Sequence, residues 1–302
     1  LHSLRRRQRQ MCIRDRSTME LWYTEEWTDN VRFSIKVDNH LFSDKSEFQQ
    51  VDVFESKEFG KFLTLDGLMM VNYKDEFIYH DMIVHTPMAT NMNIKNVLVI
   101  GGGDGGTVRE LTRYPQIEKI DMVEIDKMVV DVSRKYIDIC ACKLDDKRVN
   151  LYYEDGVAFV RNAKDASYDL IIVDSTDPIG PGEGLFSVDF YKDCYRVLGE
   201  DGILVNQNES PYFDFNAKEM KRANNKIKNL FEVTRVYQAH IPTYPSGHWL
   251  FGFASKKFDP IKNHNKEAWE NLNLKTKYYN SDIHKGAFML PQYVKDMLNE
   301  NE

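Results

Sequence analysis

The sequence predicts an α/β fold in which a small antiparallel β domain precedes a Rossmann-like, doubly wound sheet. Three observations support this prediction. An apolar run at residues 97–100 leads into a glycine cluster at 101–106 and then into a helical pattern, as in a nucleotide-binding βα turn. Strand-like and helix-like segments alternate after that turn, whereas residues 20–73 show the two-residue alternation of antiparallel strands.

The N-terminal segment is expected to form a small sheet of its own. Apolar and polar residues alternate at 32–37 and 51–54, and turns are indicated at 58–61 and 65–68, the second with an Asp-Gly hairpin signature. A sheet of this size is too small to be securely stable alone. We therefore expect residues 19–73 to form a β domain that packs on the main domain, 74–302, or on another subunit.

The main domain is expected to begin with a helix at 75–91 that carries Phe77, Ile78, Met82 and Ile83 on one face. Alternation then predicts strands at 97–100, 119–124, 149–153, 169–173 and 202–206, and helices near 106–114, 127–137, 156–163, 187–198 and 214–230. Two apolar segments, 233–237 and 249–254, are expected to close the sheet as an antiparallel pair, as in S-adenosylmethionine-dependent enzymes. A short final helix is expected within 290–298.

The first 18 residues differ from the rest of the chain. They hold six arginines and one aspartate, show no apolar periodicity and precede Met19. This text resembles translated sequencing-adapter read-through joined to a gene, so we interpret residues 1–18 as a non-native leader. The alternative is a basic arm for nucleic acid or a membrane surface.

Composition favours an acidic, cytoplasmic globular protein. The net charge is −7, and without the leader 34 basic residues face 46 acidic ones. This balance disfavours nucleic acid and favours small cationic ligands. No apolar run approaches the roughly 18 residues of a membrane span, so no membrane partner is expected. The four cysteines lack the spacing of a disulfide framework or a zinc site, so we expect reduced thiols and no metal.

The glycine turn contains an acid, Asp104, and this limits the ligand. A carboxylate there would repel a pyrophosphate by several kcal/mol in a partly desolvated site, which argues against NAD and ATP. About twenty residues on, a second apolar strand ends in Glu124, where folds of this type place the acid that binds a ribose diol. Asp104 and Glu124 together predict that the ligand is a nucleoside with a cationic tail, such as an S-adenosyl compound.

Acids also follow the other predicted strands. In an open α/β sheet the ligand lies beyond the carboxyl ends of the strands, and the acids at these ends are Asp104, Glu124, Asp155, Asp174 and Asp177. The alternative is that some of them cap the following helices, which would account for Asp155 and one other. It does not account for Asp174 and Asp177 in a loop rich in glycine and proline, so we expect a functional cluster.

Four separated motifs resemble the spermidine synthases, the polyamine aminopropyltransferase family. They are the Gly-Gly-Gly-Asp-Gly-Gly turn, Asp174-Ser-Thr-Asp-Pro-Ile-Gly-Pro, Ile241-Pro-Thr-Tyr-Pro-Ser-Gly, and Tyr79-His80 after Asp75-Glu76-Phe77. The resemblance covers about residues 19–257. It implies transfer of an aminopropyl group from decarboxylated S-adenosylmethionine to putrescine, giving spermidine and methylthioadenosine, by a homodimer or homotetramer without a cofactor.

The resemblance also implies a role for individual residues. Asp174 would be the base that accepts the amine proton, and we expect it to remain ionised at neutral pH without a strongly raised pKa. The donor and methylthioadenosine would be bound by Gln49, Asp104, Glu124, Asp155, Gly156 and Pro181. The polyamine would be bound by Tyr79, His80, Asp104, Asp174, Ser175, Asp177, Gln207 and Tyr244.

Other residues have less defined roles. The segment 176–186 is expected to act as a lid that excludes water, with an ordinary surface loop as the alternative. Met70 is expected to face the methylene chain of a short acceptor, without separating putrescine from cadaverine or agmatine. Trp22 and Trp27 either wall an amine channel or pack between strands.

Two other functions compete with this reading. A methyltransferase acting on a small amine would share the sheet, but Asp104 and the pair Asp174 and Asp177 argue against it. A non-catalytic polyamine sensor would need neither a base nor a nucleoside pocket, and the sequence has residues for both.

Overall fold

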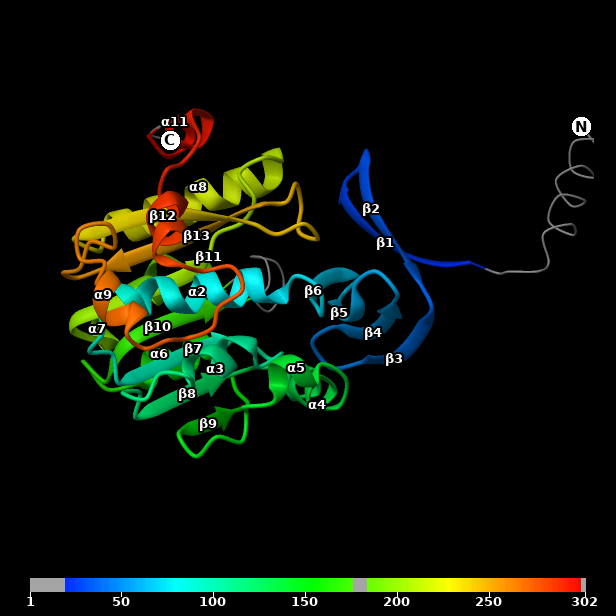
Figure 1. Cartoon of the computed structure of the whole chain (residues 1–302), viewed down its shortest axis with the longest axis horizontal. Helices are drawn as coiled ribbons and strands as arrows, with labels where there is room; N and C mark the ends of the chain where they lie inside the picture. The colour runs from blue at the N-terminus through cyan, green and yellow to red at the C-terminus, as the bar shows by residue number, and fades with distance from the viewer. Residues whose placement is uncertain (1–19, 176–183, 300–302) are drawn as a thin grey trace, which may run out of the picture.

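The computed structural model of the chain describes residues 20–175 and 184–299 (Figure 1). A seven-stranded sheet forms the larger part, with strand order β12-β13-β11-β10-β7-β8-β9. Its strands are β7 (Asn96–Gly101), β8 (Lys119–Val123), β9 (Val149–Tyr152), β10 (Tyr168–Asp174), β11 (Leu198–Gln207), β12 (Val233–His240) and β13 (His248–Ser255). The strands from β11 to β9 are parallel, and β13 and β12 close the sheet in antiparallel fashion, which confirms the predicted fold class.

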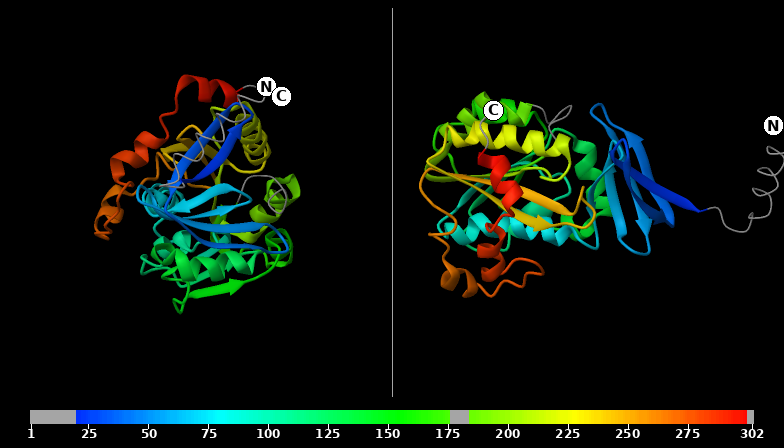
Figure 2. Two further views of the ribbon diagram at one scale, coloured as in Figure 1. Left: turned by 90° about the vertical axis from the view of Figure 1, so that its right-hand side faces the viewer. Right: turned by 90° about the horizontal axis from the view of Figure 1, so that it is seen from above.

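Helices cover both faces of this sheet because successive strand residues point to opposite sides. In β7, Val97 and Val99 join the core beneath α2, whereas Leu98 and Ile100 join the core on the other face. The first face carries α2 (Glu76–Thr90) and α3 (Gly106–Leu111), and the second carries α6 (Gly156–Asn162), α7 (Val188–Val197) and α8 (Asp214–Lys228). The view from above in Figure 2 shows this layering.

The helix α2 lies where it is predicted but is not one-sided. Fourteen of its fifteen residues are buried, and Phe77 is the half-buried exception. The four residues predicted to share a face all belong to or pack on one core cluster, but the rest of α2 is buried as well, because the helix lies between the sheet and the C-terminal segment. Its buried positions include five titratable residues, Glu76, Tyr79, His80, Asp81 and His85.

The N-terminal strands form two small antiparallel sheets at one end of the molecule (Figure 1). One pairs β1 (Leu21–Thr28) with β2 (Val31–Val37), and the other contains β3 (Asn39–Lys45), β4 (Gln50–Ser56), β5 (Gly60–Leu65) and β6 (Leu68–Asn72). Val51, Leu63 and Val71 of the second sheet pack against Val129 and Ile137 of the large domain. The expected packing on the main domain is thus confirmed.

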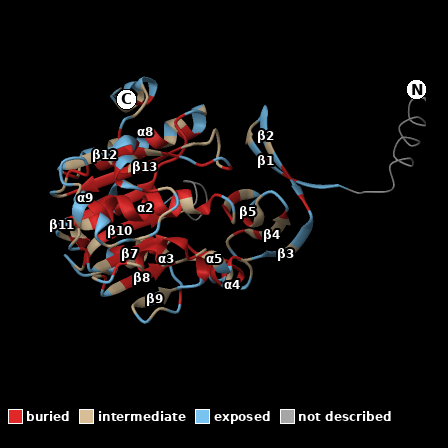
Figure 3. Cartoon of the chain, viewed as in Figure 1, coloured by how far each residue is buried: buried red, intermediate tan, exposed pale blue. Residues whose placement is uncertain are grey.

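Several short elements were not predicted. They are α5 (Asp138–Ala141), which follows α4 (Lys127–Tyr136), and the helices α9 (Lys266–Glu270) and α10 (Ser281–Ala287). The final helix, α11 (Gln292–Asn299), matches its prediction. Burial is nearly complete in β7, β10 and β13 of the large sheet and much lower on its edge strand β9 and on β1 and β2 (Figure 3). Among the described helices, none has the length and apolar character needed to cross a bilayer.

Candidate functional site

The site lies where the connections of the sheet change direction. The chain proceeds from β7 outward to β8 and β9, then returns to the other side of β7 as β10. The carboxyl ends of β7 and β10 are therefore neighbours with a crevice between their loops, which is where open α/β sheets bind ligands. The Gly102 N–H donates to the Asp174 carbonyl at 2.8 Å and joins the two ends. Gly101 has φ +81°, and a Cβ there would lie 2.1 Å from the same carbonyl oxygen.

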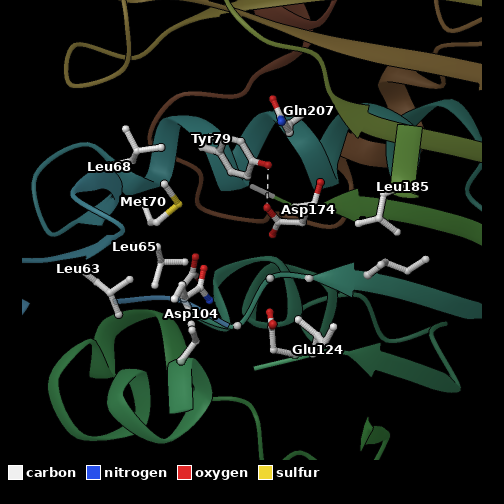
Figure 4. Close-up of a pocket in the computed structure, with 18 of the residues that line it drawn as sticks. Leu63, Leu65, Leu68, Met70, Tyr79, Asp104, Glu124, Asp174, Leu185 and Gln207 are labelled. Carbon is white, nitrogen blue, oxygen red and sulfur yellow. Dashed lines mark hydrogen bonds between the residues drawn. The ribbon is translucent and has the colours of Figure 1, made fainter. Parts of the chain in front are cut away.

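The carboxylate of Asp174 is held by two hydroxyl groups. The Tyr79 hydroxyl donates to Oδ1 at 2.7 Å (Figure 4), and the Thr107 hydroxyl donates to Oδ2 at 2.6 Å. Burial and then the charge of Asp104 raise the pKa of Asp174, while His80 and the two hydroxyl donors oppose that rise. The expected base is thus fixed in orientation, and its pKa lies above the ordinary value.

Asp104 follows β7 in the glycine turn and faces the same cavity as Asp174. Its Oδ1 accepts the Gly106 N–H at 2.6 Å and lies 3.3 Å from Nε2 of His80. Burial would raise the pKa of Asp104, but the His80 charge together with the hydrogen bonds from His80 and the Gly106 N–H outweighs burial and lowers the pKa. A Cβ on Gly106 would lie 2.2 Å from the His80 ring, so this glycine gives the imidazole its place beside the turn.

Gln49 and Glu124 meet at the other end of the cavity through Asp126. Gln49 donates its amide N–H to Oδ2 of Asp126 at 3.0 Å, and the Asp126 backbone N–H donates to Oε1 of Glu124 at 2.9 Å. Burial raises the pKa of Glu124 to about 7. A residue of the N-terminal segment thus lies beside the acid that ends β8, as the ribose prediction requires.

Asp155 and Gly156 also line the cavity, at the beginning of α6. The Asp155 side chain accepts the Val157 N–H at 2.8 Å and is exposed. The helix-capping alternative therefore holds for Asp155. A capping carboxylate at the mouth of the cavity remains compatible with the predicted contact to a base, which stays a prediction.

Gln207, Tyr244 and Ser175 line the cavity near Tyr79. Gln207 is buried, and its amide is fixed by Glu209, which accepts from Nε2 at 3.2 Å and donates its N–H to Oε1 at 3.1 Å. The Tyr244 hydroxyl donates to the Met70 carbonyl at 2.6 Å, and Met70 also lines the cavity. The Ser175 hydroxyl is buried and has no hydrogen-bond partner among the described residues.

Some predictions cannot be placed in this geometry. Asp177, Pro181 and most of the expected lid, 176–183, lie outside the described residues. Leu185, just after that stretch, lines the cavity. Trp27 stacks on Phe33 with ring centroids 5.3 Å apart, which favours strand packing over a channel wall.

Two compact buried groups of His, Cys and carboxylate atoms occur among the described residues. They are Glu76 with His80 and Cys140, and Asp81 with His85 and Glu110. Arg109 binds both oxygens of Glu76, and Arg109 and Arg113 both bind Glu110. Because arginines already satisfy these carboxylates, we assign no metal ligand in either group.

Three contacts of this site have no signal in the sequence. Thr107 reaches a carboxylate 67 positions away, and Gln49 reaches Asp126 across 77 positions. Apolar side chains of the small sheet also form one wall of the cavity, and they are Leu63, Leu65, Leu68 and Met69. Only Asp126 has a visible pattern, since it stands two residues after Glu124 and caps α4.

Comparisons with known proteins agree with this geometry. Residues 76–266 match the family model described as the spermine/spermidine synthase domain, and residues 21–72 match the spermidine synthase tetramerisation domain. The polyamine aminopropyltransferase of Clostridioides difficile (strain 630) is 80% identical over 282 residues, which cover 93% of this chain and 100% of that relative. The enzyme of the same name from Alkaliphilus oremlandii is 69% identical and covers 94% of this chain and 100% of its own.

Solved structures give the same result. A crystal structure of spermidine synthase in complex with the transition-state analogue AdoDATO superimposes with a TM-score of 0.89 at 41% identity, covering 92% of this chain and 94% of that one. Spermidine synthase from Thermotoga maritima has a TM-score of 0.89 at 40% identity and covers 93% and 95%. The chain therefore belongs to the spermine/spermidine synthase family and is an enzyme of the polyamine aminopropyltransferase type.

Proposed function

We propose that this enzyme transfers the aminopropyl group of decarboxylated S-adenosylmethionine to putrescine and forms spermidine and methylthioadenosine. The observation that carries the proposal is the charge of the cavity. Five carboxylates line it, Glu25, Asp104, Glu124, Asp155 and Asp174, and no lysine or arginine does so among the described residues. Such a cavity suits a cationic donor and a cationic acceptor, and it disfavours phosphate.

The cavity divides by composition into two ends. The amine end is formed by Tyr79, Asp104, Asp174, Gln207 and Tyr244, and the nucleoside end by Gln49, Glu124, Asp155 and Gly156. Glu124 and Gln49 are suited to the ribose hydroxyls, and Asp155 and Gly156 to the adenine. Pro181 is proposed to line this end from the 176–186 loop, which we propose to be a lid.

Donor selectivity is assigned to Asp104. The decarboxylated donor carries an ammonium group and no α-carboxylate, so an ionised Asp104 attracts it. Ordinary S-adenosylmethionine would place its own carboxylate near Asp104, and like charges that close repel strongly in a partly desolvated site. Selectivity then comes from repulsion as well as attraction.

The transfer is a direct displacement. The lone pair of the acceptor nitrogen forms a bond to the methylene carbon attached to the sulfonium, and the carbon–sulfur bond breaks with its electrons returning to sulfur. An alkylamine has a pKa of about 10.4 and is an ammonium near neutral pH, so its lone pair becomes available only when a proton leaves. Asp174, which Tyr79 and Thr107 hold in place, accepts that proton as the attack proceeds, and the product nitrogen carries the positive charge that leaves sulfur.

The acceptor's second ammonium group is placed at Gln207, Tyr244 and Asp177, with the backbone near Ser175 beside the reacting amine. The Tyr244 hydroxyl donates a hydrogen bond to the Met70 carbonyl, and a hydroxyl oxygen can also accept from an ammonium group. The half-buried Met70 side chain faces the same cavity and suits the methylene chain between the two amines.

Neither competing function has support of this kind. The relatives of highest identity reported above are named aminopropyltransferases, which argues against a methyltransferase. A base fixed by two hydroxyl groups argues against a sensor that performs no chemistry. We further propose a homo-oligomer, because residues 21–72 match a tetramerisation domain, and a cytoplasmic location, because Cys140, Cys142 and Cys194 are free thiols.

The test uses protein beginning at Met19, incubated with putrescine and either decarboxylated or ordinary S-adenosylmethionine. Mass spectrometry follows spermidine, methylthioadenosine and methylated amines. Spermidine from the decarboxylated donor alone is expected. Methylated amine from the ordinary donor would contradict the proposal, and cadaverine and agmatine tested in parallel define the acceptor range.

A further inference from the structure

A buried row of alternating charges leads from α3 to the amine end of the cavity. Arg109 donates through two nitrogens to Glu76, at 3.1 and 2.9 Å. Glu76 Oε2 lies 2.6 Å from Nδ1 of His80, and Nε2 of His80 lies 3.3 Å from Oδ1 of Asp104. Along this row, cationic groups on Arg109 and His80 alternate with the carboxylates of Glu76 and Asp104. The row ends at the Asp104 carboxylate, which faces the cavity.

His80 has carboxylates at both ring nitrogens and is 2% exposed. A neutral imidazole has one N–H, so its other nitrogen would direct a lone pair at a carboxylate. The remaining titratable groups around it are Tyr79 on α2, Cys140 on α5, Arg109 on α3 and Asp174 on β10. This geometry favours the doubly protonated imidazolium.

Electrostatics supports the same state. Burial alone would lower the pKa of His80, but Asp104 and Glu76 outweigh it and raise the pKa to about 10. Burial would likewise raise the pKa of Glu76, yet His80 and Arg109 lower it to about 2. Each member of the row is therefore charged over the range in which most enzymes operate.

We propose that Arg109 and Glu76 are positioning residues that hold His80 as an imidazolium, and that this cation lets Asp104 and Asp174 be ionised together before substrates bind. The inference rests on the proposed function only in its last step, where Asp174 is the base. It departs from the expectation that His80 binds the polyamine, since an imidazolium would repel an ammonium group. His80 acts instead through Asp104.

The need for a cation follows from the acid pair. Asp104 and Asp174 face one partly desolvated cavity. When two carboxyl groups share such a site, the charge of one raises the pKa of the other, so both are not readily ionised together. Burial and Asp104 raise the pKa of Asp174, and His80 lowers it. Without the imidazolium, Asp104 and Asp174 would share one proton. As the pH falls, Asp174 of the free enzyme would then become protonated at a higher pH than in the wild type.

The same helix offers a matched control. One turn further along α2, His85 is fully buried and lies 3.1 Å from Glu110 and 3.6 Å from Asp81. This second imidazole–carboxylate group does not line the cavity. Asp81 and His85 are four residues apart on α2, as Glu76 and His80 are, whereas Glu110 also accepts from Arg109. Changes at His85 and Asp81 therefore disturb a similar buried cluster without touching the acid pair or Arg109.

The first experiment follows the histidine rings by NMR in protein labelled with ¹⁵N-histidine. The His80 signal is identified by its loss in His80→Gln. We expect it to remain an imidazolium from about pH 6 to about pH 9, against an ordinary midpoint of about 6.5. Glu76→Gln should lower its midpoint by at least about one pH unit, and Asp81→Asn should leave it in place.

Two NMR results would overturn the inference. One is a wild-type His80 that titrates near its ordinary midpoint, which needs no variant and so remains decisive even if Glu76→Gln does not fold. The other is a midpoint that moves as far in Asp81→Asn as in Glu76→Gln, since that would indicate a general structural effect.

The second experiment measures kcat/KM for the donor against pH, because this parameter reports the ionisation of the free enzyme. His80→Gln should move the acid limb of this profile to higher pH by about one unit. His85→Gln should leave the pH of the limb unchanged, even where it lowers kcat/KM at every pH. An acid limb unmoved in His80→Gln would overturn the role assigned to the imidazolium.

These readouts separate the inference from the proposed function. If no spermidine forms, the proposed function fails, and the His80 titration can still be read. If spermidine forms while His80 titrates at its ordinary pH, the inference fails and the proposed function stands.

Discussion

At the amine end of the cavity Asp174 accepts hydrogen bonds from two hydroxyl groups and Asp104 pairs with an imidazole, whereas at the nucleoside end Glu124 accepts the backbone N–H of Asp126. A nearby cation lowers the pKa of Asp104, while burial raises that of Glu124 to about 7. The fold thus places acids in two environments at neighbouring strand ends. This difference assigns them different tasks, since Asp104 is held in its charged form, whereas Glu124 can exchange a proton as it binds hydroxyl groups.

The largest effect should come from the base. Asp174→Asn removes the proton acceptor but keeps the shape. Its amide oxygen can accept from one of the two hydroxyl groups of Tyr79 and Thr107, and the other hydroxyl must turn to accept from the amide NH2. Turnover should fall by on the order of 10²- to 10⁴-fold, while methylthioadenosine binding by calorimetry stays within a few-fold. Asp169→Asn is the control, since Asp169 lies at the other end of the same strand and accepts N–H groups of Lys95 and Asn96. Near-normal turnover in Asp174→Asn would remove Asp174 from the base role.

The next effect concerns Asp104 and the choice of donor. Asp104→Ala removes the charge that repels a carboxylated donor, so the preference for the decarboxylated donor should narrow by on the order of tenfold to 100-fold. The preference is measured as the ratio of kcat/KM for the two donors. Glu124→Gln should weaken both donors equally and leave this ratio unchanged. An unchanged ratio in Asp104→Ala would contradict the repulsion argument.

The sequence predicts the acids of the site better than it predicts the contacts that hold them in place. Asp104, Glu124 and Asp174 are foreseeable because each follows an apolar strand, and parallel strands bring their carboxyl ends to one edge. The contact between Thr107 and Asp174 depends on β7 and β10 being neighbours, and no local pattern encodes that neighbourhood. The complete burial of α2 is hidden for a related reason, since the covering segment follows it by nearly 200 residues.

The polar residues of α2 show most clearly which features cannot be predicted from local sequence. Glu76, His80, Asp81 and His85 give the helix a mixed pattern that is typical of a half-exposed helix. In the structure each finds a polar partner from another element, so burial is tolerated. The partners are Arg109 for Glu76, Asp104 for His80, the Tyr114 hydroxyl for His85 and backbone N–H groups of 277–279 for Asp81. The hydrophobic periodicity of a helix indicates which of its side chains prefer water, and it contains no information about partners that come from distant parts of the chain.

A smaller effect should distinguish the nucleoside end. The pKa of Glu124 is about 7 in the free enzyme, and ribose hydroxyls donate to its ionised form, so binding should release a proton near neutral pH. Affinity for methylthioadenosine should therefore fall as pH decreases from about 8 to about 6, by up to about tenfold. Calorimetry in buffers of different ionisation enthalpy measures both quantities. Glu124→Gln should bind more weakly and without this pH dependence, and a wild-type affinity that is flat with pH would show that Glu124 is ionised throughout.

The smallest effect should come from Thr107, whose hydroxyl stabilises the ionised form of Asp174. Thr107→Val keeps the volume and removes the donor, so the pKa of Asp174 should rise and the acid limb of kcat/KM should move up by up to about one pH unit. The loss of kcat/KM should be greatest on the acid side of that limb and vanish above it, because the base is ionised there in both proteins. Thr107→Ser keeps a hydroxyl and should leave the limb near its wild-type position. If the limb lies at the same pH in Thr107→Val and Thr107→Ser, the hydroxyl does not set it, and the amine end would depend on Tyr79 and His80 alone to keep its base ionised.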